Sequence, residues 1–127
     1  MAYTLLIVDD SSTTRSIIKK VLGLTQLELG EIHEAKNGAE GLEKMRSCWI
    51  DLVLADLNMP VMNGSEMISA MGHDELLQKI PVVVVSSEGN QPLLDSLAKR
   101  GVREIIRKPF EPALLRRVIE QALHAQA

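Results

Sequence analysis

The sequence has few aromatic residues, a single cysteine and no long apolar run. Its 127 residues include one Tyr, one Trp and one Phe, and Cys48 is the only cysteine. A lone cysteine excludes an internal disulfide and favours a reducing compartment. No apolar run approaches the roughly 20 residues that a membrane-spanning helix requires, and no basic stretch typical of a signal peptide precedes the first apolar run. We therefore expect a cytoplasmic protein without a membrane segment.

The sequence also has no cluster of basic residues. The formal net charge is −3, and pairs of basic residues such as 19–20, 99–100 and 116–117 lie far apart in the sequence. Such sparse pairs do not form the positive stripe that follows a nucleic-acid backbone. Direct nucleic-acid binding is not expected, although a longer parent chain with a DNA-binding domain stays open.

The length and composition predict one folded domain over residues 1–127. A chain of 127 residues is near the most frequent size of a single domain. Hydrophobic residues make up 46% and charged residues 24%, which is typical of a globular protein with a packed core.

Short apolar runs alternate with amphipathic segments along the chain. Runs at 5–8, 52–55, 82–85 and 105–106 are typical of buried strands, and the more polar segment 31–35 is a fifth candidate. Between and after them, apolar residues recur at helical spacing, most clearly after Pro112. The residues that define the expected helix faces are Ile17, Ile18, Val21 and Leu22; Leu42 and Met45; Met67, Ile68 and Met71; Leu93, Leu94 and Leu97; and Leu114, Leu115, Val118, Ile119, Ala122 and Leu123.

This alternation predicts a doubly wound α/β fold, in which helices cover both faces of a parallel sheet. Segments 31–35 and 103–107 carry the most charge among the candidate strands, and charged residues are favoured at sheet edges. Placing them at the edges fits the strand order 2-1-3-4-5, one of the two common orders of such sheets.

Aspartates follow two of the predicted inner strands. Asp9 and Asp10 follow the run 5–8, and Asp56 follows the run 52–55. Doubly wound sheets bind ligands beyond the carboxyl ends of the strands, where the winding reverses. Three carboxylates gathered there would repel one another unless a cation intervened, and their oxygens suit Mg²⁺. Either aspartate group alone is equally typical of a loop or helix N-cap.

Two further polar side chains follow the other predicted strands. Ser86 comes after the run 82–85, and Lys108 comes after 105–106. A hydroxyl and an ammonium beside a metal site can hold the oxygens of a phosphoryl group, because phosphoryl transfer depends on positioning and charge neutralisation. Alone, each residue is more typical of a strand-end cap or a solvated lysine.

The order of these motifs resembles the response-regulator receiver family, and specifically its CheY-like single-domain members. The resemblance covers essentially the whole chain and is carried by LLIVDDSSTTR at 5–15, DLNMP at 56–60 followed by Gly64, VVVVSSE at 82–88 and KPF at 108–110. It implies a flavodoxin-like (βα)5 fold and a switch in two-component signalling that modifies itself rather than an enzyme that turns over a substrate. Chemotaxis is one pathway that such members serve.

The resemblance also implies the metal site. Asp10 and Asp56 would bind Mg²⁺ directly, with Mn²⁺ as a substitute. Asp9 would contribute mainly through water, and the backbone carbonyl of Asn58 would complete the protein ligands.

The resemblance further implies that Asp56 accepts the phosphoryl group from a sensor histidine kinase. Ser86 would bond one phosphoryl oxygen, Lys108 would pair with another, and the Lys108–Pro109 peptide would be cis. A phosphatase would be a second partner, and a downstream protein would bind the surface of the fourth helix, fifth strand and fifth helix. Ile105 stands where the family usually carries Tyr or Phe, so the ring that reports phosphorylation is missing.

Three other functions compete with this interpretation. A flavin-binding protein could use residues 11–14 to hold a phosphate, but Asp9 and Asp10 would repel that group, and stacking aromatics are scarce. An aspartate-nucleophile phosphatase usually has a second Asp where this chain has Asn58. A phosphate sink, a phosphorelay intermediate or a receiver fragment of a transcriptional regulator would share every residue above.

Overall fold

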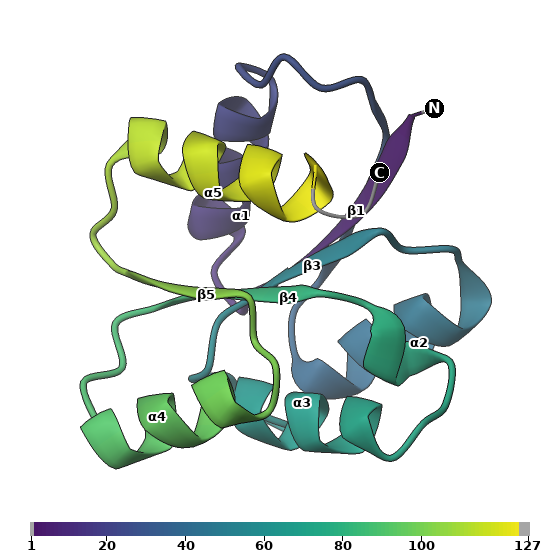
Figure 1. Ribbon diagram of the computed structural model, residues 1–127, viewed down its shortest axis with the longest axis vertical. Coiled ribbons are helices and arrows are strands. Elements are labelled where there is room, and N and C mark those ends of the chain that lie inside the picture. Colours follow the sequence, from purple (N-terminus) through teal and green to yellow (C-terminus); the bar gives the residue numbers. More distant parts are fainter. Residues whose placement is uncertain (1, 125–127) are drawn as a thin grey trace.

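The computed structural model describes residues 2–124, and these form one five-stranded parallel sheet with helices on both faces (Figure 1). The strand order is β2-β1-β3-β4-β5, which confirms the predicted doubly wound fold. The strands are β1 (Tyr3–Val8), β2 (Leu29–Ala35), β3 (Leu52–Ala55), β4 (Val82–Ser86) and β5 (Glu104–Arg107).

The helices lie in two layers. On one face of the sheet are α1 (Ser12–Leu22) and α5 (Pro112–His124). On the other face are α2 (Gly38–Ser47), α3 (Gly64–Gly72) and α4 (Gln91–Lys99), with a short 3-10 turn η1 (Leu77–Lys79) before β4 (Figure 1). In the part of the chain that the structure describes, no helix is long and apolar enough to cross a membrane.

Two hydrophobic cores, one on each face, explain the uninterrupted apolar runs in the sequence. Successive strand residues point to opposite faces, so Leu5 and Ile7 pack with α1 and α5, whereas Leu6 and Val8 pack with the other three helices. All four are fully buried. A strand covered on both faces has no solvent side to carry polar residues.

The two edge strands are β2 and β5, as their charged residues predict.

The apolar stripes of two helices are narrower than their sequences suggest. Ile17 of α1 is 45% exposed and Leu114 of α5 is 37% exposed, whereas Ile18 and Leu115 beside them are buried. Each exposed residue lies one position before its buried neighbour, about 100° away around the helix, and therefore falls outside the buried part of the stripe.

The connection from β3 to α3 contains a strained turn. Val61 has φ 67°, and the amide of Met62 donates to the carbonyl of Pro60 over 2.8 Å. This three-residue turn with positive φ is rare, and it is unfavourable for a β-branched residue. Shortly after it, Gly64 packs so tightly that a Cβ atom would collide with the Asp56 carbonyl oxygen. The turn and this glycine bring α3 against the end of β3.

We predict that Val61→Gly stabilises the protein. Val61 is 84% exposed, so its side chain contributes little packing. A positive φ costs a non-glycine residue roughly 1–2 kcal/mol, and part of the gain is offset because glycine adds entropy to the unfolded chain. The free energy of unfolding in urea should rise by about 0.5–1 kcal/mol. Val61→Ala keeps a Cβ and should gain less, and no gain for Val61→Gly would contradict the assigned strain.

Candidate functional site

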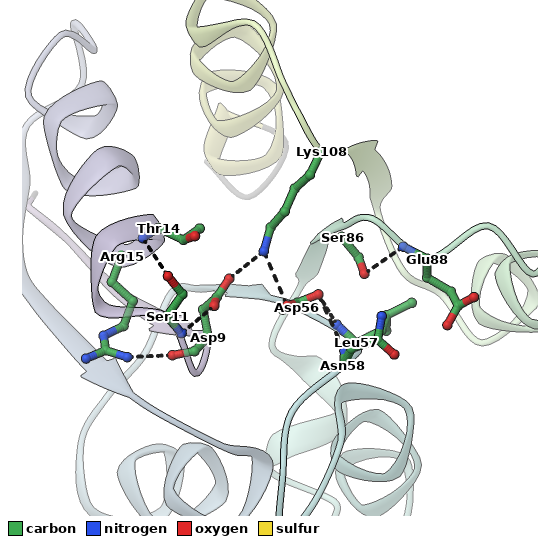
Figure 2. A network of polar contacts seen from close by, with 10 residues as sticks. All are labelled: Asp9, Ser11, Thr14, Arg15, Asp56, Leu57, Asn58, Ser86, Glu88 and Lys108. Atoms are coloured by element: carbon green, nitrogen blue, oxygen red, sulfur yellow. Dashed lines mark hydrogen bonds and ion pairs between the residues drawn. The ribbon is translucent and has the colours of Figure 1, made fainter.

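The predicted polar residues meet at the carboxyl ends of the inner strands and β5 (Figure 2). Asp9, Asp56 and Ser86 are among the few buried polar residues, with 2%, 7% and 1% of their surface exposed. Asp10 and Asn58 are exposed. Convergence follows from the parallel sheet, because all strands end at the same edge.

Lys108 links the aspartates that follow β1 and β3. Its Nζ lies 2.9 Å from Asp9 Oδ2 and 3.2 Å from Asp56 Oδ2. Burial lowers the pKa of Lys108, but hydrogen bonding and attraction by Asp9, together with Asp56, outweigh burial, so its pKa is raised. The lysine is therefore charged and held between two carboxylates. The Lys108–Pro109 peptide that positions it is cis, as the resemblance implies.

The two oxygens of Asp56 have different surroundings. Oδ1 accepts a hydrogen bond from the Leu57 amide at 2.7 Å and a longer one from the Asn58 amide at 3.4 Å. Oδ2 faces Lys108 (Figure 2). The amides fix the carboxylate through one oxygen and leave the other directed toward the ammonium group.

Asp9 is fixed by the start of α1. Its Oδ1 accepts from the Ser11 amide at 2.8 Å, and the Ser11 hydroxyl in turn accepts from the Thr14 amide at 3.2 Å. The second contact is an N-cap of the helix. Ser11 therefore has a structural role in this turn, which disfavours the flavin-phosphate interpretation of residues 11–14.

The carboxylates suit a divalent cation. Asp9, Asp10 and Asp56 each offer an oxygen, and these oxygens lie within 4.8 Å of one another. Three carboxylates carry three negative charges, whereas Lys108 supplies one positive charge, so about two charges remain uncompensated among these four groups. Hard oxygen donors with this excess charge fit Mg²⁺. The exposed Asn58 follows two residues after Asp56, and its carbonyl as a ligand stays a prediction.

Ser86 ends β4 beside Asp56 (Figure 2). Its hydroxyl accepts a hydrogen bond from the Glu88 amide at 3.2 Å. A hydroxyl that accepts one hydrogen bond still has a proton to donate. Ser86 can therefore donate to a group that arrives at Asp56 while it keeps its contact with the β4–α4 loop.

An ion network next to Asp9 was not predicted from the sequence. Arg15 of α1 donates through Nη1 to the Asp9 carbonyl at 2.6 Å and through Nε to Glu34 of β2 at 2.9 Å. Lys19 binds the other Glu34 oxygen at 2.9 Å. Hydrogen bonds from Lys19 and Arg15 lower the pKa of Glu34, and burial opposes them only in part. The only sequence signal was a pair of cations one helical turn apart, which is common on exposed helices.

Most of the chain matches the model of a known protein family. Residues 5–120 match the family described as "Response regulator receiver domain". The chain belongs to this family.

Its similar relatives include chemotaxis proteins. It is 36% identical over 120 residues to chemotaxis protein CheY1 of Helicobacter pylori, covering 94% of this chain and 95% of that protein. It is also 36% identical over 117 residues to chemotaxis protein CheY of Pseudomonas aeruginosa, covering 92% and 93%. The chain is thus a CheY-like receiver domain of two-component signalling.

Solved structures agree with this fold. A CheY-like response regulator receiver domain protein from Methanospirillum hungatei has a TM-score of 0.86 at 25% identity, covering 99% of this chain and 97% of that chain. Chemotaxis protein CheY4 of Vibrio cholerae has a TM-score of 0.84 at 26% identity, covering 97% and 100%.

The lowered pKa of Glu34 predicts a pH dependence of stability. A carboxyl group whose pKa is depressed by folding stabilises the protein above its unfolded pKa of about 4.3, and this contribution is lost as the pH falls through the folded pKa. The free energy of unfolding of Glu34→Gln should therefore lie below that of the unsubstituted protein at pH 6. The difference should narrow as the pH falls below about 4.3.

Urea unfolding between about pH 2.5 and about pH 7, a range that extends well below the unfolded pKa of about 4.3, would measure this difference. Glu43→Gln, at an exposed glutamate of α2, is the control and should show a smaller dependence on pH. A difference for Glu34→Gln that stays constant across the series would contradict the role of the ion pairs.

Proposed function

We propose that this chain acts as a single receiver domain over residues 1–127, in which Asp56 accepts a phosphoryl group from a sensor histidine kinase. The observation that supports this most is the environment of Asp56. It is a buried carboxylate with one oxygen held by backbone amides and the other directed toward Lys108. Such a carboxylate is oriented for bond formation at Oδ2.

The metal would be Mg²⁺, with Mn²⁺ as a substitute. Asp10 and Asp56 would bind it directly, Asp9 mainly through water, and the Asn58 backbone carbonyl would complete the protein ligands. The excess negative charge of the carboxylate cluster supports this assignment. When bound, such an ion neutralises charge on the phosphoryl oxygens and on the carboxylates.

The transfer would be a displacement at phosphorus. Asp56 Oδ2 attacks, an O–P bond forms, and the N–P bond to the donor imidazole breaks, with its electron pair passing to the ring nitrogen. Lys108 neutralises one phosphoryl oxygen and Ser86 donates to another. Water later cleaves the resulting mixed anhydride, and a phosphatase is a second partner in that step. The protein therefore modifies itself and does not turn over a substrate in bulk.

The phosphoryl group would act as a switch by adding charge at the strand ends. It adds nearly two negative charges, and Lys108 and Ser86 would move toward it. The β4–α4 loop and α4 would respond, and a downstream protein would bind α4, β5 and α5. Without an aromatic ring at Ile105, the response would depend on these contacts.

The pathway we favour is chemotaxis in the cytoplasm, because the similar relatives carry that name and the free Cys48 suits a reducing compartment. The alternative is a phosphate sink, a phosphorelay intermediate or a receiver fragment of a longer regulator. Beads that carry the phosphorylated protein or its Asp56→Asn variant would separate them. A switch retains an output protein on the phosphorylated beads alone.

We predict that Asp56→Asn abolishes phosphorylation. An amide cannot form the acyl phosphate, so incubation with acetyl phosphate and Mg²⁺ should add no hydroxylamine-sensitive phosphoryl group to the variant. Intact-protein mass spectrometry measures this. Asp95→Asn, at an exposed aspartate of α4, is the matched control and should be labelled like the unsubstituted protein.

Removal of the metal with EDTA should also abolish labelling. An equal yield of hydroxylamine-sensitive label on Asp56→Asn would exclude Asp56 as the acceptor. Label that forms at the same rate in EDTA would exclude the divalent cation from the reaction.

A further inference from the structure

We propose that Arg15 is a positioning residue of the metal site. It holds the peptide between Asp9 and Asp10 so that the Asp10 carboxylate faces Asp56. This inference rests on the proposed metal site, and it assigns to Arg15 a contribution to metal affinity in addition to its ion pair.

The contact with Asp9 is to the backbone, which makes it relevant to Asp10. Arg15 Nη1 lies 2.6 Å from the Asp9 carbonyl oxygen (Figure 2), and this carbonyl belongs to the peptide that leads to Asp10. The rest of Asp9 is also held: its amide donates to Ala35, and its side chain binds Ser11 and Lys108. Arg15 thus fixes the remaining polar group of Asp9.

Asp10 depends on this backbone. It is exposed, whereas Asp9 and Asp56 are buried. Its carboxylate nevertheless lies with theirs in one cluster. Surrounding side chains constrain an exposed side chain less than a buried one, so the direction of the Asp10 carboxylate is set largely by the peptide that Arg15 holds.

Arg15 is itself held in a geometry that suits arginine. Its Nε donates to Glu34 while Nη1 donates to Asp9, and Lys19 binds the second Glu34 oxygen. The Arg15 side chain is only 18% exposed. A planar guanidinium can satisfy two acceptors in fixed directions, whereas a lysine offers one ammonium group. Arg15 therefore links β2 to the Asp9–Asp10 turn.

Charge and positioning predict opposite effects when Arg15 is replaced. Arg15 is a cation beside a cation site, so removing its charge should strengthen metal binding by Coulomb's law. Losing a group that orients a metal ligand weakens binding, typically by about 10-fold to 100-fold. Arg15→Lys keeps the charge and removes the two-acceptor geometry. Electrostatics alone predicts little change for that variant, and positioning predicts weaker binding.

The test is a titration with Mn²⁺ in which electron paramagnetic resonance measures free Mn²⁺. The Kd should increase by about 10-fold for Arg15→Met and for Arg15→Lys. Arg116→Met is the matched control, because Arg116 pairs through Nε with Glu120 on α5 at 3.5 Å, and its Kd should stay unchanged. Lys and Met are both good helix formers, so α1 should persist.

Urea unfolding in EDTA supplies a second measurement. A merely structural role would lower the free energy of unfolding in the Arg15 variants but leave the Kd of the folded protein unchanged, and that result would overturn the proposal. A tighter Kd for Arg15→Met would overturn it in favour of charge alone.

The Asp10→Asn variant distinguishes failure of the role of Arg15 from failure of the proposed metal site. If it weakens Mn²⁺ binding while the Arg15 variants do not, only the role of Arg15 fails. If Asp10→Asn leaves the Kd unchanged, the proposed metal site fails as well.

Discussion

The crowding of three carboxylates at the ends of β1 and β3 is the constraint on which the site depends. Their oxygens lie within 4.8 Å of one another, and two of the three aspartates are buried. Like charges at this range raise the free energy of the ionised state unless opposite charge is close. Lys108, which directly follows β5, meets part of this requirement. The remaining charge makes the site a strong candidate for a divalent cation and for a phosphoryl group that arrives with one.

The fold maintains this crowding through apolar packing and through backbone contacts. Strands β1 and β3 are adjacent and parallel, with Val8 opposite Ala55, so the aspartates that follow them are necessarily neighbours. Both strands are buried on two faces, which makes a shift in register costly. Amides then occupy one oxygen of Asp9 and one of Asp56. The repulsion is therefore resisted by the hydrophobic cores and by hydrogen bonds at the strand ends.

The contrast between apolar packing of the strands and individual polar contacts explains what could be predicted from the sequence. The apolar run at 52–55 and the charged segment 31–35 identified an inner and an edge strand, because full burial and a partly exposed place at the sheet edge leave different marks on composition. Asp56 followed from its place after such a strand. The contact of Arg15 with Glu34 did not, since it depends on how edge strand β2 lies beside α1. Nor did the positive φ of Val61, because nothing in its local sequence requires that turn.

The absence of an aromatic residue at position 105 changes how a phosphoryl group on Asp56 would be sensed. Ile105 is partly buried and packs on the same core as Leu93 and Leu94 of α4. Because its side chain is aliphatic, it has no ring that could rotate between two positions. Ser86 offers a different connection. Its hydroxyl already accepts from the Glu88 amide, and it keeps one proton for a phosphoryl oxygen. A single hydroxyl would then join the modified aspartate to the β4–α4 loop. Because Asn90 in that loop caps α4, a shift of the loop would reach the helix through its first turn.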